Sequence, residues 1–328
     1  MVYYCIQRGQ KVNYGANVDT EQISRDCGLY DDLDYKGIIS NIVKLESEYE
    51  ESELIQIYNY MLSKTSNPDV IMFLIQCEDK YRHPSSLEVL VDILLFKNAA
   101  GCDENIKEKY VGVRVMCAKA IANQKNTNVV NSLLYCLNNK DENYRVRLAC
   151  ADALGKIGDK YAVAPLIEVV KDEEEKSVYV RESAATALGL LGDYRAVEPL
   201  VSILETKQGI MDKFSFLKER VIEALDKMGF NSDERVFRAL RQSLADESSQ
   251  VRIEAIEAIM NSEHPKAYDI IKECMINDTD EEVKRNALIA LYNMSDRKIL
   301  EEVIQSSKYS GSLKIAAQNI IDEYEGDE

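Results

Sequence analysis

The stretch "VRESAATALGLLGDYRAVEPL", residues 180–200, nearly repeats "VRLACADALGKIGDKYAVAPL", residues 146–166. Both begin with an apolar-basic pair and carry Ala-Leu seven residues later, a register mark that recurs along the chain. The marks begin at Val113, Val146, Val180, Leu217, Val251, Val283 and Leu313, with successive spacings of 33, 34, 37, 34, 32 and 30 residues. A period of this length with two helix-length apolar patterns predicts a helical solenoid, in which each repeat buries its apolar face against its neighbours.

The repeat that begins at Val180 contains the pattern of two helices. Apolar residues at helical spacing from Val180 to Leu191 form one buried face. Gly192 suits the left-handed conformation that ends a helix, and Asp193 is a capping residue for the next element. Pro199 falls in the first turn of the second helix, where its missing N–H costs little. We therefore expect an all-α fold of paired helices.

Charged residues keep the same register. An acidic residue stands five positions before a mark, and a basic residue stands one position after it. The members of this set are Asp141, Arg147, Glu175, Arg181, Asp246, Arg252, Asp278 and Lys284. We expect them to form a ladder of hydrogen bonds that joins each repeat to the next. The alternative is that Arg147, Arg181 and Arg252 form a stripe that binds anions.

These motifs resemble HEAT repeats, in particular the short subtype related to the bilin-lyase family, whose units read "VRxxAxxALGxxGDxxAvxpL". The resemblance is close over residues 141–206, looser over 111–321, and fades before about residue 100. It implies a right-handed α-α superhelix of about eight or nine helix pairs, whose second helices line the concave side. It implies less about function, because the fold hosts many roles.

The repeats are expected to continue upstream in degenerate form. Residues 36–110 lack the register marks but keep helical periodicity, with two helices expected in 37–64 and two more in 68–96. Residues 111–328 carry the HEAT-like repeats. We expect both segments to form a single continuous solenoid.

The segment 1–35 differs from the rest. It is rich in tyrosine and shows no sustained helical pattern. It predicts either an irregular cap that hides the apolar face of the first repeat, or a partner-binding arm that uses Tyr3, Tyr4 and Tyr14.

The amino-acid composition limits the classes of partner and the cellular compartments that we expect for this protein. With 57 acidic and 40 basic residues, the net charge of −17 opposes binding to nucleic acid or to an anionic membrane surface. No apolar stretch is long enough to cross a bilayer, and the first residues do not read as a signal peptide. The eight cysteines form no CxxC motif, which favours reduced, buried thiols. We expect a cytoplasmic protein that binds other proteins.

Catalytic and cofactor motifs are not found in the sequence. The two histidines, His83 and His264, are each followed by proline and do not form the clusters that iron or zinc sites need. No glycine-rich phosphate loop follows a strand pattern. The acidic runs at 31–34 and 171–176 are typical of solvated surface. We expect no catalytic residue, no metal and no cofactor.

An insert lengthens the repeat between marks 180 and 217. Its apolar residues are Ile210, Met211, Phe214 and Phe216. They predict a loop that offers a hydrophobic contact to a partner. The alternative is that Phe214 and Phe216 begin the core face of the next helix.

A row of arginines is the second candidate. Arg235, Arg238 and Arg241 recur at intervals of three on a second helix, where they would face the groove and bind carboxylates or phosphate. The alternative is pairing with Glu198, Glu205 or the acids of the next repeat.

Three functions follow from these features. The first is a non-catalytic interaction scaffold, an adaptor or a subunit of a multi-protein complex, that binds through its concave face or its N-terminal arm. The second, implied by the family resemblance, is a lyase or chaperone that holds a chromophore or cofactor during its attachment to a protein. The third, a nucleic-acid-binding HEAT protein, is opposed by the acidic composition.

Overall fold

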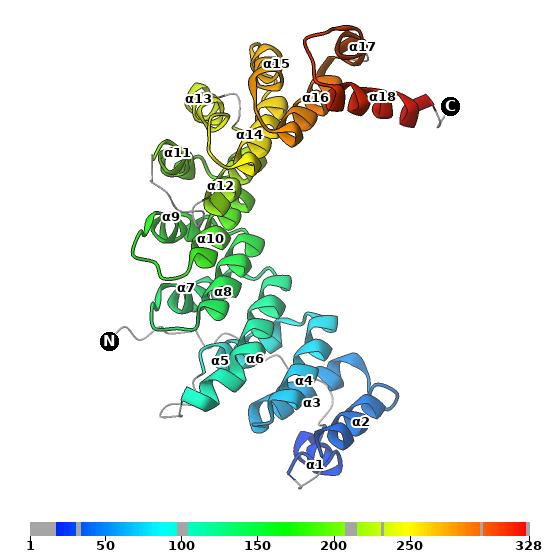
Figure 1. Ribbon diagram of the computed structural model, residues 1–328. Coiled ribbons are helices and arrows are strands. Elements are labelled where there is room, and N and C mark those ends of the chain that lie inside the picture. Colours follow the sequence, from blue (N-terminus) through cyan, green and yellow to red (C-terminus); the bar gives the residue numbers. More distant parts are fainter. Residues whose placement is uncertain are drawn as a thin grey trace. The chain divides into compact units, whose positions relative to one another are not determined.

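The computed structural model describes residues 18–30, 34–96, 104–206, 215–230, 233–295 and 298–325 (Figure 1). Within these ranges the regular secondary structure is entirely helical, with eighteen α-helices and several 3₁₀ turns. The all-α solenoid of about eight or nine helix pairs predicted from the sequence is therefore confirmed. None of the described helices combines the length and apolar character needed to span a membrane. The chain divides into two compact units, residues 1–124 and 125–328.

Unit 1 is built from helices α1 to α6. Their bounds are α1 Thr20–Asp26, α2 Tyr35–Leu45, α3 Glu51–Lys64, α4 Pro68–Tyr81, α5 Leu87–Leu94 and α6 Glu104–Asn123. In the packing, α3 contacts α1 and α4, while α6 lies against α4 and α5. The boundary predicted at residue 110/111 falls inside α6, which continues through it as one helix.

Helix α1 shows that part of the segment 1–35, which was expected to be irregular, is helical. Residues 20–26 are helical, and the Asp19 side chain accepts a hydrogen bond from the Gln22 N–H at 3.0 Å. Ile23 and Cys27 are buried. The helix has only seven residues, so it is too short to produce a clear apolar period in the sequence. Tyr3, Tyr4 and Tyr14 lie outside the described residues.

A carboxyl group is buried in the core of unit 1. Glu78 on α4 is fully buried, and the Ser86 hydroxyl donates a hydrogen bond to its Oε2 atom. Among the described residues, its Oε1 atom has no hydrogen-bond partner. Burial raises the pKa of Glu78 from 4.5 to about 7, while the bond from Ser86 opposes the rise.

This buried acid predicts a pH dependence of stability. The folded protein holds the Glu78 proton more tightly than the unfolded chain, so the free energy of unfolding falls as pH rises from 4.5 to about 7. The shift corresponds to a loss of about 3 kcal/mol. We expect Glu78→Gln to remove most of this decline, measured by urea unfolding at pH 5 and pH 8. The exposed neighbour Glu88 supplies the control, and a Glu88→Gln protein that also lost the decline would contradict the assignment.

Unit 2 consists of regular helix pairs. The first helices carry the register marks, and the second helices follow them. The bounds are α7 Val130–Asn138, α8 Tyr144–Ile157, α9 Val163–Lys171, α10 Val178–Leu191, α11 Val197–Glu205, α12 Ser215–Lys227, α13 Glu234–Ser243, α14 Ser249–Asn261, α15 Ala267–Asn277, α16 Glu281–Ser295, α17 Lys298–Gln305 and α18 Gly311–Glu325. Thus even-numbered helices from α8 to α18 are first helices, and the odd-numbered ones are second helices.

The turn between the two helices of a pair follows the sequence signals. Gly192 ends α10 at φ 59°, and its N–H donates to the Leu188 carbonyl at 3.1 Å. The Asp193 side chain then accepts the Arg195 N–H at 3.0 Å and caps a 3₁₀ turn that leads into α11. Pro199 lies in the first turn of α11, as predicted.

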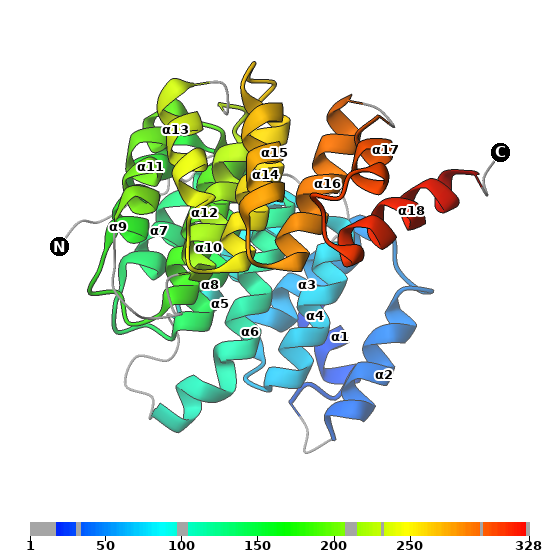
Figure 2. The same ribbon diagram turned by 45° about the horizontal axis from the view of Figure 1, so that its top comes forward.

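The first helices of unit 2 are packed closely together. A Cβ atom on Gly155 would lie 2.8 Å from the Ala187 Cα, and one on Gly189 would lie 2.9 Å from the Ala224 Cα. Contacts between α8, α10 and α12 are accordingly extensive, whereas α9 and α11 touch sparsely. Figures 1 and 2 show the first helices on the inner side of the curve that unit 2 describes, with the second helices outside. The expectation that the second helices line the concave side is therefore wrong for this unit.

Candidate partner-binding surfaces

A buried ion pair links the repeats at α8 and α10. The two terminal nitrogens of Arg147 donate to the Oε1 and Oε2 atoms of Glu175 at 2.9 and 2.7 Å, and its Nε donates to the Leu137 carbonyl at 2.8 Å. The Arg147 and Glu175 side chains are 4% and 2% exposed. Burial alone would raise the pKa of Glu175, but the bonds from Arg147 and from the Ser177 N–H lower it overall.

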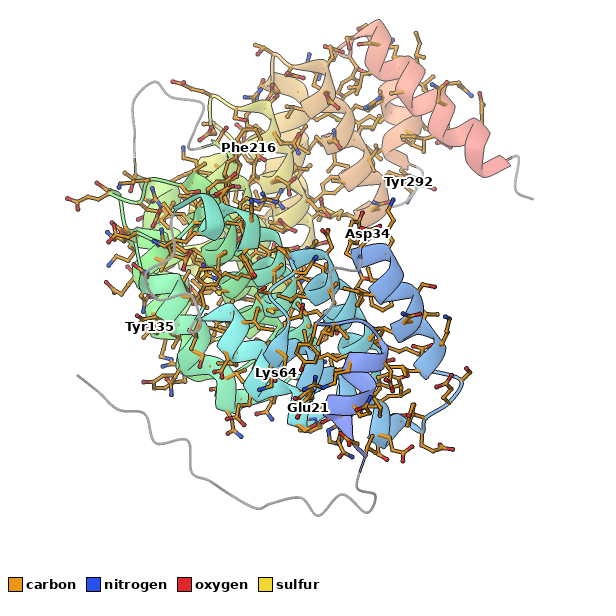
Figure 3. All side chains as sticks on the ribbon, turned by 90° about the horizontal axis from the view of Figure 1, so that it is seen from below. Glu21, Asp34, Lys64, Tyr135, Phe216 and Tyr292 are labelled. Carbon is orange, nitrogen blue, oxygen red and sulfur yellow. The ribbon has the colours of Figure 1, made fainter. Side chains whose placement is uncertain are left out.

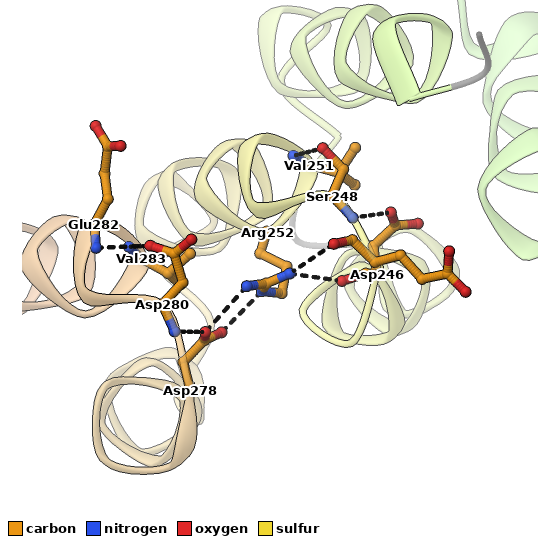
Figure 4. Close-up of polar contacts among 9 residues, drawn as sticks. Asp246, Ser248, Val251, Arg252, Asp278, Asp280, Glu282 and Val283 are labelled. Atoms are coloured by element: carbon orange, nitrogen blue, oxygen red, sulfur yellow. Dashed lines mark hydrogen bonds and ion pairs between the residues drawn. The ribbon is translucent and has the colours of Figure 1, made fainter. Parts of the chain in front are cut away.

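A second rung lies between α14 and the turn before α16 (Figure 4). Arg252 donates from Nε and Nη2 to the Asp278 carboxylate at 2.8 and 3.0 Å, and from Nη1 to the Asp246 carbonyl at 2.8 Å. The Asp246 carboxylate in turn accepts Lys218 Nζ at 2.5 Å. These contacts join the basic residue of one repeat to the acid of the next.

The remaining members of the predicted ladder are not seen to form the expected pairs between repeats. Arg181 is buried and donates from Nε to the Val170 carbonyl at 2.9 Å, while the acid expected opposite it lies in 207–214, outside the described residues. Lys284 pairs with Glu281 of its own helix at 2.7 Å. Asp141 lies in the turn before α8, where its N–H donates to the Asn139 side chain at 3.2 Å. Since Arg147 and Arg181 are buried, they are not placed as an anion-binding stripe.

The arginine row on α13 divides into two parts. Arg235 contacts Glu198 at 3.1 Å and Asp233 at 3.2 Å, and also donates to the Tyr194 hydroxyl. Pairing with Glu198 was the alternative interpretation of this row. Arg238 and Arg241 are exposed. The three arginines belong to α13, a second helix, and the second helices lie on the outer side of the curve of unit 2; the sequence-based expectation that this row faces the concave groove is therefore not supported.

An open groove of about 490 Å³ lies beside this row. Arg241, Arg252, Cys274 and Asp278 are among its lining residues. Burial raises the pKa of the Cys274 thiol to about 11, so at neutral pH the group is a protonated thiol rather than a nucleophilic thiolate. The Arg252–Asp278 ion pair at the same groove is engaged in the ladder. The groove is therefore a surface depression without an activated group.

The insert before α12 is described only at its end. Phe216, on the first turn of α12, is 59% exposed (Figure 3). Its exposure does not fit the alternative that Phe216 itself begins the core face of α12, because the next residue, Leu217, is buried instead. Ile210, Met211 and Phe214 lie outside the described residues.

The two histidines occupy local structural positions. The His83 ring accepts the Ser85 N–H at 3.2 Å and caps the 3₁₀ turn before α5. His264 stacks on Phe237 with a centroid separation of 3.7 Å. Across the described ranges, no group of three or more His, Cys, Asp or Glu side chains is arranged to hold a metal ion.

The concave face of unit 2 carries a cluster of acids that the sequence did not reveal. It is contributed by the first helices α10, α12 and α14; Glu223 and Glu257 are exposed, whereas Glu219 is buried. We define this concave acidic cluster as Glu182, Glu219, Glu223, Asp226, Glu254 and Glu257. Arg220 lies among these acids and donates to the Glu223 carboxylate at 2.5 Å. A groove of about 190 Å³ opens between α12 and α14, lined by four of the acids and by Arg220.

Stacked helix pairs with inter-repeat ion pairs define an α-solenoid. The profile of HEAT repeats matches residues 106–178, 140–211 and 208–292, which together exceed half of the chain. The chain therefore belongs to the HEAT-repeat family. A search of curated proteins found no match.

Solved structures are similar to this chain to different degrees, all at low sequence identity. The complex of CpcE and CpcF of phycocyanin lyase from Nostoc sp. PCC7120 is 22% identical, with a TM-score of 0.41, over 73% of this chain and 87% of that one. Human deoxyhypusine hydroxylase is 18% identical, with a TM-score of 0.33, over 83% and 96%. A mutant of Kap121p is 13% identical, with a TM-score of 0.51; the match covers 91% of this chain but 36% of Kap121p. Such likeness describes the fold alone.

Proposed function

We propose that this protein is a non-catalytic scaffold that binds a protein partner on the concave face of unit 2, as an adaptor or as a subunit of a larger complex. A HEAT solenoid suits protein interaction, because it presents a long surface relative to its mass. The single observation that carries the proposal is the content of the concave face. Two apolar side chains of the first helices that form this face, Leu190 of α10 and Phe216 of α12, are 40% and 59% exposed, and the same helices carry the acids of the concave acidic cluster. Such a mixture is typical of a surface that a protein covers.

The negative charge of the same face indicates which class of partner it binds. Carboxylates repel nucleic-acid phosphates and anionic lipids, so we propose protein rather than either of these. Cys117, Cys136 and Cys150 are buried in the helical core and belong to no disulfide bond among the described residues, which supports the cytoplasm as the proposed compartment. The N-terminal arm stays a second proposed contact, although its tyrosines lie outside the described residues.

Partner capture by the full chain tests the proposal. We expect Phe216→Asp to reduce recovery of the captured partner about tenfold or more, because burying an unpaired carboxylate in an interface is costly. The matched control is Tyr135→Asp on α7, a second helix, where the tyrosine is 69% exposed (Figure 3). Quantitative mass spectrometry after low-salt affinity purification is the measurement. Equal recovery with both variants, or equal loss, would contradict the concave face as the binding surface.

The lyase or maturation chaperone is the alternative proposal. It requires a chromophore or cofactor to be held by the protein during transfer. An absorption band in the visible region that co-purifies with the full chain, and that is lost on denaturation, would favour this alternative over the scaffold.

A further inference from the structure

A groove opens between α16 and α18, the last two first helices that the structure describes. Its volume is about 640 Å³, and its lining includes the apolar residues Ile289, Leu313, Ile315, Ala316 and Ile320. The Ile289 side chain is 39% exposed and that of Ile315 is 63% exposed. Exposed apolar side chains that gather in one groove usually mark a surface of interaction.

The groove continues the concave face of unit 2. Ile315 stands two positions after its register mark and Ile289 six positions after its own, as Glu219 and Glu223 do in the concave acidic cluster. Because the first helices repeat the same packing, equal register positions lie on the same side of the stack. The concave face therefore extends beyond the acids of α10, α12 and α14 into an apolar groove.

Larger side chains keep α16 and α18 apart. Between α8, α10 and α12, a glycine nine positions after the mark lies against an alanine of the next first helix. In α16 that glycine position holds Tyr292, and in α18 the alanine position holds Ile320. Ile320 is only partly buried, whereas the corresponding alanines of the preceding repeats, from Ala120 to Ala290, are all buried. The crevice that is closed between earlier first helices is therefore open here.

The two helices are joined at one end of the groove. The Ser310 hydroxyl donates to the Oε2 atom of Glu281 at 2.8 Å, and the Ser312 hydroxyl donates to the same oxygen. Bonds from Lys284, Ser312 and Ser310 lower the pKa of Glu281 to about 2, so the carboxylate stays charged at neutral pH. From this end α18 runs away from α16 at an angle (Figure 2). A trough that widens between two helices has the shape to receive the apolar side of a third helix.

The charges around the groove select the occupant. Glu282, with which Arg285 pairs at 3.6 Å, stands near the joined end, and exposed Asp322 stands near the opposite end of α18. The next first helix, α14, adds exposed Glu257. A second copy of this chain would bring the same acids and its own net charge of −17 to the groove, so charge opposes it. A helix with basic side chains complements these acids.

We propose that the groove between α16 and α18 binds an amphipathic helix of a partner protein, with the apolar side of that helix against Ile289 and Ile315 and its lysine or arginine side chains toward Glu257 and Asp322. This inference rests on the proposed scaffold function and names the class of segment that the concave face binds. The apolar groove supplies the buried contact, and the acids on either side of it fix the orientation of the helix.

Binding of synthetic peptides to the full chain tests the inference. The probe is a fluorescent peptide with leucines at helical spacing on one side and lysines on the other. One match has the same composition in an order that forms no apolar side, and a second has glutamate in place of each lysine. We expect both matches to bind at least about tenfold more weakly, because one loses the buried apolar contact and the other is repelled. Equal binding of the reordered peptide would show attraction by net charge alone and overturn the proposal.

Matched protein variants locate the site. We expect Ile315→Asp to weaken binding of the leucine-lysine peptide about tenfold or more, because the interface would bury an unpaired carboxylate. Ile276→Asp makes the same change on the second helix α15, where Ile276 is 47% exposed, and should change the affinity less than about twofold. Ile315→Ala adds no charge and should still weaken binding about threefold or more. Equal effects of Ile315→Asp and Ile276→Asp, or unchanged binding by Ile315→Ala, would overturn the proposal.

Two further readouts separate this groove from the rest of the concave face and from self-association. Partner capture should be lost with Ile315→Asp as it is with Phe216→Asp. If Phe216→Asp abolishes capture while Ile315→Asp retains it, the scaffold stands and the groove between α16 and α18 fails as the site. Sedimentation of the full chain should give a monomer in the absence of partner. A dimer that Ile315→Asp dissociates would show that the occupant is a second copy and overturn the proposal.

Discussion

Replacing Glu175 with alanine is expected to lower the free energy of unfolding by about 3–5 kcal/mol. The substitution leaves the Arg147 guanidinium buried without its carboxylate, since the two side chains are 4% and 2% exposed. Its remaining bond, to the Leu137 carbonyl, does not neutralise the charge. Taking an ion out of water without a counter-ion is among the largest single penalties known for a point mutation. Equilibrium denaturation of the full chain, followed by circular dichroism, measures the change.

The neighbouring pair Lys140–Asp172 provides the control. It joins the same two repeats at 2.5 Å, but Lys140 is 55% exposed and remains hydrated after its partner is lost. Asp172→Ala should therefore cost only a small fraction of the loss seen with Glu175→Ala. The double variant Arg147→Met with Glu175→Leu should recover most of the stability, because it leaves no charge unpaired. Equal costs for the Glu175 and Asp172 substitutions would show that burial does not determine the strength of these rungs.

The helix pairs could be predicted because each repeat shows the same local signals. Val180 and Leu188 are buried on one helical face, and Gly192 and Asp193 form the turn that their residue types favour. Helix capping and the 3.6-residue apolar period both depend on residues that are close together in the sequence, so a single sequence reveals them. Helices α1 to α5 were less visible, because they lack the register marks and show only apolar periodicity in the sequence.

The concave side could not be predicted in the same way. Both helices of a pair have an apolar face, so the pattern does not show which stack curves inward. The curvature depends on how closely neighbouring helices approach each other. Gly155 and Gly189 allow a close approach between first helices, because each lies against an alanine of the next first helix, Ala187 or Ala224. A glycine within a helical pattern, at the same register position in two repeats, was the available signal.

The concave acidic cluster was missed for a related reason. Its acids belong to three helices of successive repeats, with 37 positions from Glu182 to Glu219 and 28 from Asp226 to Glu254, so they form no charge run. The runs that are visible in sequence, such as 171–176, are solvated turns. Reading the residues two and six positions after each register mark would have found Glu182, Glu219, Glu223 and Glu257 on one face.

Adding a methyl group at Gly155 or Gly189 should be the second most damaging change in unit 2. A Cβ at Gly155 would lie 2.8 Å from the Cα and 2.9 Å from the Cβ of Ala187, and one at Gly189 would lie 2.9 Å from the Ala224 Cα. Since backbone cannot move aside as a flexible side chain does, the helices must separate. We expect each alanine to lower the free energy of unfolding by about 1–3 kcal/mol from overpacking.

That loss should appear despite the better helix propensity of alanine, which favours the variant by about 1 kcal/mol. Gly112 on α6 isolates this propensity term, because a Cβ there meets nothing within 4 Å. Gly112→Ala should therefore be neutral or stabilising by about 0.5–1 kcal/mol, while Gly155→Ala and Gly189→Ala move in the opposite direction. Stabilisation by all three alanines in urea unfolding would mean that the first helices are not held at this distance. That result would also contradict the placement of the first helices on the inner, concave side of unit 2.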